Sequence, residues 1–348
     1  MAANRFSVLA VVVLVLVSGS VLYFYSTTTA GVPRQVVVLE SPADASVFSS
    51  DSNNLFLLDG QMLRLWDIQR GRVVSEISLN HQPLKILLSP DEFSMAILYR
   101  DSDTVEIRDS IDWHNVKQIN AEGEALDGTY SEDGRYLYLA TTATTLPFKV
   151  SLEIWDLRDM VLVHSIRWDT SKRAFRLPVA ISRNGEFLAI GITENDFSAT
   201  VYVLSTASYS EVSQMSVHTS VLSLTWLNDP NRLAVGGHHS WLGVLDLREK
   251  RVIHVIDRYG QVSEIALSPN GCFLASGGLE QPTMLWNTEN WQPAARFRDL
   301  STLASVRNID FSNDGRYIVL DESDRYIRTT DVWELPPSFY VSDSCSGD

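Results

Sequence analysis

Residues 268–278 read SPNGCFLASGG, and the tripeptide Leu285-Trp286-Asn287 follows them six residues later. A Ser-Pro-Asn-Gly turn joins two strands readily, because Asn tolerates left-handed backbone and Gly adopts positive φ without steric cost. The run after the turn is short and apolar, which is typical of a buried strand. The stretch therefore predicts two strands joined by a tight turn, and a third strand that ends in Trp-Asn.

The same unit recurs seven times along the chain. Five close copies of the turn occur at 89–92, 131–134, 182–185, 268–271 and 312–315, and two degenerate copies at 49–52 and 227–230. The third strands end at 66–67, 108–109, 155–156, 204–205, 245–246, 286–287 and 330–331, so successive ends lie 41 to 49 residues apart. Seven copies in phase predict an array of small antiparallel sheets rather than two separate domains.

This pattern resembles the WD40 repeat family. Leu65-Trp66-Asp67, Ile154-Trp155-Asp156 and Leu285-Trp286-Asn287 match its strand ending, and residues 268–278 match its first hairpin. The chain departs from the family because no Gly-His dipeptide precedes a first strand, and only three of the seven endings keep Trp. The resemblance implies an all-β, seven-bladed β-propeller over residues 35–335, at 43 residues per blade.

The end of the seventh repeat suggests how the ring closes. Pro336 and Pro337 follow its third strand, and proline cannot donate to a sheet ladder. A full fourth strand is therefore not expected there. The apolar residues 35–40 at the other end of the body are predicted to pair with the seventh blade and to cover its edge.

The N-terminal residues 6–25 carry no ionisable group apart from tyrosines, and as a helix they would span about 30 Å. Residues 1–25 are therefore predicted to contain one transmembrane helix, followed by a linker over 26–34. Arg5 is the only charged side chain before Arg34, which favours a cytoplasmic N-terminus and an extracytoplasmic propeller. The alternative is a signal peptide cleaved near Ser18-Gly19-Ser20, which would leave a secreted or periplasmic protein.

The composition excludes several classes of protein. The formal net charge of −15 provides no basic surface for nucleic acid phosphates. Two cysteines cannot build a disulfide framework, and no CxxC pair indicates a zinc site, so neither a metal nor a cofactor is expected. Cys272 is predicted to be a buried small hydrophobe, and Cys345 to be exposed and dispensable within the polar tail 336–348.

No catalytic motif is evident, because the chain lacks GxSxG, Walker A, GxGxxG, HExxH and EF-hand patterns. The first hypothesis is therefore a membrane-anchored, non-enzymatic scaffold that binds a protein or peptide partner, with the long loop 141–150 as its best single site. The alternative is a propeller enzyme, a hydrolase or lyase, acting in the central channel. Arginine and aromatic side chains in predicted loops are typical of binding surfaces. The candidates of this kind, with two apolar loop residues and a His pair, are Arg100, Leu146, Phe148, Trp168, Arg176, His238, His239, Trp241, Arg258 and Tyr259.

Overall fold

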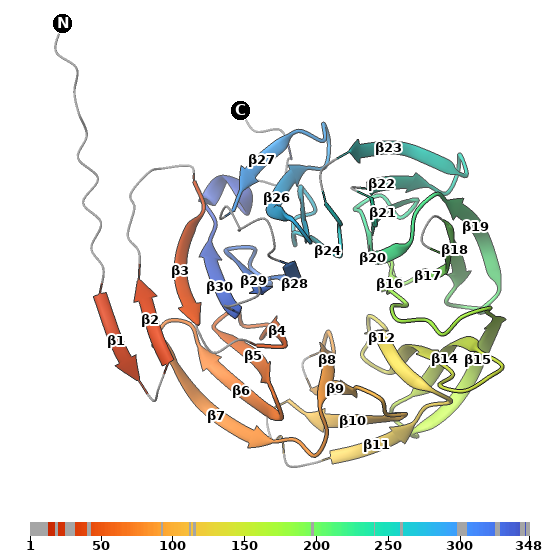
Figure 1. The fold of residues 1–348 in the computed structure, drawn as a ribbon, viewed down its shortest axis with the longest axis horizontal. Helices are drawn as coiled ribbons and strands as arrows, with labels where there is room; N and C mark the ends of the chain where they lie inside the picture. The colour runs from red at the N-terminus through yellow and green to blue at the C-terminus, as the bar shows by residue number, and fades with distance from the viewer. Residues whose placement is uncertain are drawn as a thin grey trace, which may run out of the picture.

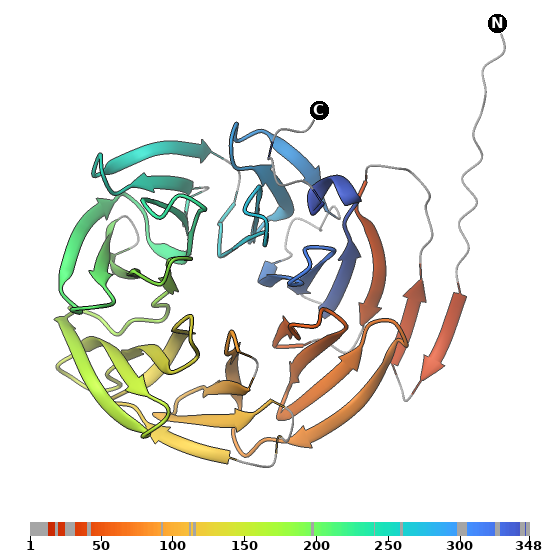
Figure 2. The ribbon, with the colours of Figure 1, turned by 180° about the vertical axis from the view of Figure 1, so that it is seen from behind.

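Seven antiparallel sheets follow one another around a ring, each with the first strand of its repeat innermost, and in blades one to six the last strand of the repeat is outermost (Figure 1). The reverse view shows the same closed ring, with the N-terminal strands outside it (Figure 2). This computed structural model describes residues 13–17, 20–24, 32–39, 43–91, 93–110, 113, 116–195, 198–239, 241–257, 260–297, 305–323, 328–341 and 345. The chain is a seven-bladed β-propeller, as the repeats predict.

Blades one to six each take four strands from one sequence repeat, and blade seven takes three from the last repeat. Blade one holds β4 Ala45–Phe48, β5 Asn54–Asp59, β6 Met62–Asp67 and β7 Arg72–Ser78. Blade two holds β8 Pro83–Leu88, β9 Ser94–Tyr99, β10 Thr104–Asp109 and β11 Val116–Asn120. Blade three holds β12 Glu124–Tyr130, β13 Tyr136–Thr142, β14 Lys149–Asp156 and β15 Val161–Asp169. Blade four holds β16 Val179–Ile181, β17 Phe187–Asn195, β18 Ser198–Ser205 and β19 Glu211–Val217. Blade five holds β20 Val221–Trp226, β21 Arg232–Gly237, β22 Trp241–Asp246 and β23 Arg251–Asp257. Blade six holds β24 Glu264–Leu267, β25 Phe273–Gly278, β26 Gln281–Asn287 and β27 Pro293–Arg296. Blade seven holds β28 Ser305–Phe311, β29 Tyr317–Ser323 and β30 Arg328–Glu334.

The turn between the first and second strands of a blade is held by its own serine. In six of the described turns, the serine hydroxyl donates to the Asp or Asn two residues later, over 2.5–2.7 Å. The same hydroxyl oxygen accepts a hydrogen bond from the backbone N–H five residues on, as Ser268 does from Phe273 at 3.0 Å. The repeated Ser-x-Asp/Asn pattern therefore specifies a turn that closes with local hydrogen bonds.

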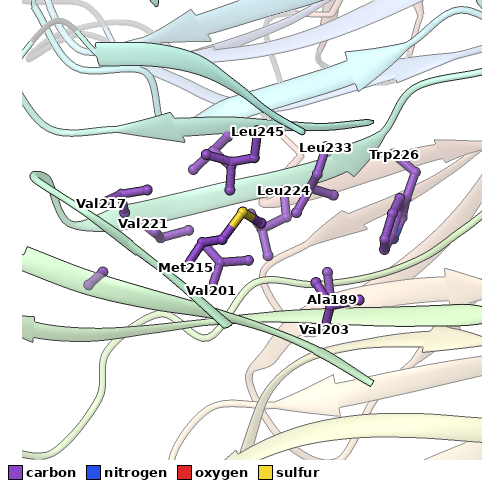
Figure 3. Close-up of a cluster of buried hydrophobic side chains, with 12 residues drawn as sticks. Ala189, Val201, Val203, Met215, Val217, Val221, Leu224, Trp226, Leu233 and Leu245 are labelled. Carbon is purple, nitrogen blue, oxygen red and sulfur yellow. The ribbon is translucent and has the colours of Figure 1, made fainter. Parts of the chain in front are cut away.

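Seven buried apolar clusters hold the blades together, and each lies between two neighbouring blades. Figure 3 shows the cluster between blades four and five, where Met215 and Val201 face Leu233 and Leu245. The second strand of each blade is buried on both faces and is therefore apolar on both sides, as in β5 and β9, whereas outermost strands such as β7 are largely exposed. The core is therefore a ring of interfaces, and no blade is expected to fold alone.

The Trp residues that end the third strands pack into these interfaces. Trp66, Trp155 and Trp286 are all buried, which confirms blade packing as their role. The indole N–H of Trp155 donates to Glu153 at 2.9 Å, and that of Trp286 donates to Ser276 at 2.9 Å. Blade two has Arg108 at the same position, and there the guanidinium pairs with buried Glu106.

The ring is closed by its own beginning. Strand β3 (Arg34–Leu39) runs antiparallel to β30 in blade seven, with Val37 opposite Val332 and Leu39 opposite Thr330. β3 takes the place of the fourth strand that Pro336 and Pro337, after the seventh repeat, exclude. The predicted closure is confirmed.

The described residues of the N-terminal segment form strands, whereas the sequence predicts a helix there. Val13–Val17 and Ser20–Phe24 form strands β1 and β2, which pair with each other, and β2 meets β3 through the single pair Leu22–Leu39. Valine-rich sequence favours extended backbone, which accounts for the strands. Residues 1–12 and 25–31, including most of the predicted linker, lie outside the described residues. Within the described part of the chain, no helix is long and apolar enough to span a membrane.

The C-terminal tail packs against blade six, contrary to the prediction for Cys345. Cys345 forms a disulfide with Cys272, with their Cα atoms 4.8 Å apart. The short 3-10 helix Pro337–Phe339 brings Phe339 against Phe273, with ring centroids 4.8 Å apart, and Asn287 donates to the Cys345 carbonyl at 2.7 Å. Both cysteine predictions therefore need correction: Cys272 is buried but covalently bonded, and Cys345 fixes the tail.

Blade seven carries two carboxyl groups with raised pKa values where it meets blade one. Burial raises the pKa of Asp310 to about 7, although the Phe48 N–H donates to its carboxylate at 2.9 Å. Burial likewise raises the pKa of Asp321 to about 6, against hydrogen bonds from Thr330 and Ser46. The folded state thus holds protons that the unfolded chain, with carboxyl pKa values near 4, releases.

We expect the free energy of unfolding to fall as the pH rises from 5 to 8, by on the order of 2 kcal/mol, because the native state binds more protons over this range. Urea denaturation at pH 5 and pH 8 measures the difference. Asp310→Asn should reduce this difference in the free energy of unfolding, because it removes one of the two carboxyl groups with a raised pKa. Asp133→Asn should leave it unchanged, because the hydrogen bond from Ser131 lowers the pKa of Asp133 and moves its titration below this range. A wild-type protein equally stable at both pH values would contradict the prediction.

Candidate functional site

The innermost strands begin around a cavity of about 330 Å³ on one face of the ring. We call this cavity the channel mouth. In every blade, the residue four positions before the turn serine, or before its counterpart Leu227, lines it. These seven residues are Ala45, Lys85, Asp127, Pro178, Ser223, Glu264 and Asn308. One repeat position therefore supplies the wall of the cavity from all seven blades.

Three ion pairs cross between blades at the channel mouth. Lys85 pairs with Asp127 of the next blade, Arg176 pairs with Glu264 at 2.7 Å, and Arg307 pairs with Asp44 at 3.3 Å. The Arg176 guanidinium also donates to the carbonyl oxygen of Ser263 at 3.1 Å. The mouth is therefore a charged site whose carboxylates are each engaged by a cation.

The pKa values of these groups reflect burial and pairing. Burial is the largest single influence on Lys85 and alone would lower its pKa, but the charge and hydrogen bond of Asp127 together with the charge of Glu264 outweigh it, so the pKa is raised. The negative charge of Glu264 raises the pKa of Arg176. Burial raises the pKa of Glu264, and the attraction of Arg176 opposes this shift. Both basic groups therefore stay charged at neutral pH.

The loop 170–178 enters the channel mouth from blade four. Arg173 binds Glu124 and lies 3.5 Å from Asp101, while Arg176 reaches across to blade six. Between these two anchors Phe175 is 83% exposed and lines the cavity. A large apolar side chain held in water between two fixed arginines is a feature of a binding surface.

Arg100 is the fourth cation of the mouth. It is the first residue after β9, and its exposed side chain lines the cavity. Within the part of the chain that the structure describes, its guanidinium has no carboxylate or hydrogen-bond partner. The structure therefore brings together Arg100 and Arg176, two of the residues that the sequence predicts for binding.

The other predicted binding residues do not line the channel mouth. Leu146 is 77% exposed and Phe148 is half-buried in a loop shortened to 143–148, because β13 and β14 extend further than predicted. Trp168 packs on Tyr202 between blades three and four, with ring centroids 5.2 Å apart, and Trp241 packs on the cluster of blades four and five. His238 and His239 face each other in the turn after β21, and Arg258 and Tyr259 lie outside the described residues.

Sequence reasoning missed Lys85, Asp127, Glu264 and Arg307 as well as Phe175. The first three share the repeat position four residues before the turn serine, so aligning the repeats would have found them. Among the described residues, no group of three or more His, Cys, Asp or Glu side chains is placed to hold a metal ion.

Comparisons with known proteins agree with the fold. No protein-family model matches the chain. The U3 small nucleolar RNA-associated protein 18 homolog of Drosophila melanogaster is 26% identical over 152 residues, which cover 41% of this chain and 29% of that protein's length. Hydrazine synthase of Kuenenia stuttgartiensis superposes with a TM-score of 0.68 over 81% of this chain and 92% of its own, at 17% identity, which shows the fold alone. The chain is a seven-bladed β-propeller built from WD40-like repeats.

Proposed function

We propose that this protein is a non-enzymatic scaffold whose channel mouth binds a protein or peptide partner. The observation that carries the proposal is Phe175, which stands 83% exposed over a charged cavity and is fixed by ion pairs on both sides. Such preorganisation reduces the entropy lost on binding. The carboxylates of the mouth are each bound to a cation, which supports recognition rather than acid–base chemistry.

Selection of random peptides on the immobilised full chain tests this proposal. We expect the enriched peptides to bind Phe175→Ala at least tenfold more weakly, because exposed aromatic anchors dominate interface energies. Leu146→Ala is the matched control, since Leu146 is similarly exposed but lies outside the mouth. Peptides that lose affinity with Leu146→Ala instead would place the site on the loop 143–148. Failure to enrich any peptide would contradict the proposal.

We propose further that residues 6–25 tether the protein to a membrane, with the propeller on the extracytoplasmic side. The strand pair β1–β2 and a helix are alternatives for the same apolar residues, and a bilayer selects the helix because it satisfies every backbone hydrogen bond internally. The disulfide Cys272–Cys345 supports an oxidising compartment. Alkaline carbonate washing should leave the protein in the membrane pellet. Recovery in the supernatant would favour the secreted form.

A further inference from the structure

We propose that the channel mouth captures the carboxyl-terminal end of its peptide partner, with the terminal carboxylate on Arg100 and an apolar last side chain against Phe175. This inference rests on the proposed function and adds the chemistry of the ligand.

The first argument is charge. Among the described residues that line the mouth, four are cationic and three carry carboxylates. Each carboxylate is engaged by one of these cations, and Asp44 also lies 3.6 Å from Arg328; among the described residues, the Arg100 guanidinium has no ion-pair or hydrogen-bond partner. The site is therefore net positive in a protein whose formal net charge is −15. It attracts a single negative group and repels the ammonium group of an amino-terminal end.

The second argument is the chemistry of guanidinium. Its planar fork donates two parallel hydrogen bonds to one carboxylate, which a point charge such as lysine cannot do. Arg100 is held at its backbone, where its N–H donates to the carbonyl oxygen of Gln82 at 3.0 Å, while its side chain stays exposed in the cavity. The backbone of Arg100 is therefore fixed, and no described residue binds its guanidinium.

The third argument is the far end of the channel. Arg183, in the turn after β16, reaches from blade four to blade six, where it donates to the carbonyl oxygens of Ser268 and Pro269 at 2.8 and 3.0 Å. We expect a peptide that enters the mouth to meet this cross-connection at the turn end of the innermost strands. The end of a chain fits such a site better than a segment that must pass through.

The lining supplies a place for the last side chain. Leu84, Leu126 and Ile265 line the mouth together with exposed Phe175. An apolar terminal residue buries its surface there, at about 25 cal/mol per Å² removed from water. The terminal carboxylate of the peptide and its apolar last side chain together define the ligand that we predict.

Two pools of random heptapeptides test this proposal on the immobilised full chain in detergent. One pool has free terminal carboxylates and the other is amidated, and the retained peptides are quantified by mass spectrometry. We expect at least tenfold greater retention of the free-acid pool, with apolar last residues enriched. Arg100→Gln should abolish this preference, and Arg100→Lys should restore part of it. Arg158→Gln is the control, because Arg158 is also exposed but lies in the turn after β14, outside the mouth.

The outcomes separate this inference from the proposed function. Equal retention of both pools that is still lost with Phe175→Ala overturns the carboxylate inference and leaves the binding function intact. Enrichment of amidated peptides with internal Asp or Glu overturns it in favour of acidic side chains. Retention of neither pool contradicts both proposals.

Discussion

Deletion of residues 34–39 should abolish the cooperative unfolding of the propeller. These residues form β3, which pairs with β30 over five residues and buries Val37 and Leu39 at the interface of blades seven and one. Without β3, blade seven has an open edge and the cluster it shares with blade one is exposed. Because the stability of a repeat ring depends on interfaces between neighbours, opening one interface releases the constraint on the others. Differential scanning calorimetry should show the single sharp transition replaced by a broad one at lower temperature.

Deletion of residues 13–24 is the matched control. It removes β1 and β2, which are strands of the same sheet, but β2 meets β3 through one residue pair. We expect its calorimetric transition to remain sharp. If the β3 deletion melts like the intact chain, the propeller does not depend on its N-terminal strand for closure.

The propeller could be predicted because its signals are local and repeated. The serine of each turn bonds to the Asp or Asn two residues later, so residues such as Ser131 and Asp133 specify the turn without help from distant segments. The closing strand followed from proline chemistry, since Pro336 and Pro337 exclude a fourth strand at the other end. Seven repetitions of one weak pattern made a strong prediction.

The features that sequence reasoning missed depend on long-range contacts. Cys272 and Cys345 are 73 residues apart, and they come together through long-range contacts of the tail with blade six, such as the packing of Phe339 on Phe273. Phe175 is exposed because neighbouring arginines bind carboxylates from other blades, such as Glu124 and Glu264. No local pattern encodes these pairings. The channel-lining position, by contrast, was present in every repeat and required only that the repeats be aligned.

Arg108→Ala should destabilise the protein by about 3–5 kcal/mol, because it leaves a carboxylate buried without its counter-ion. Glu106 is 1% exposed, and Arg108 donates to it through Nε at 2.9 Å and through a terminal nitrogen at 2.6 Å. The same guanidinium donates to the carbonyl oxygen of Trp113 at 2.6 Å. Urea denaturation at pH 7 measures the loss as a lower midpoint.

Blade three supplies the control for this prediction. There Glu153 is also buried and lies two residues before Trp155, as Glu106 does before Arg108, but its side-chain donors are the indole of Trp155 at 2.9 Å and the hydroxyl of Thr141 at 2.8 Å. Arg108→Trp would give Glu106 a donor at the equivalent position, so it should cost less than half as much as Arg108→Ala. Glu106→Gln combined with Arg108→Ala should also recover part of the loss, because no charge is then left buried. If all three variants are equally unstable, the lost stability comes from packing of the arginine stem and not from the stranded charge.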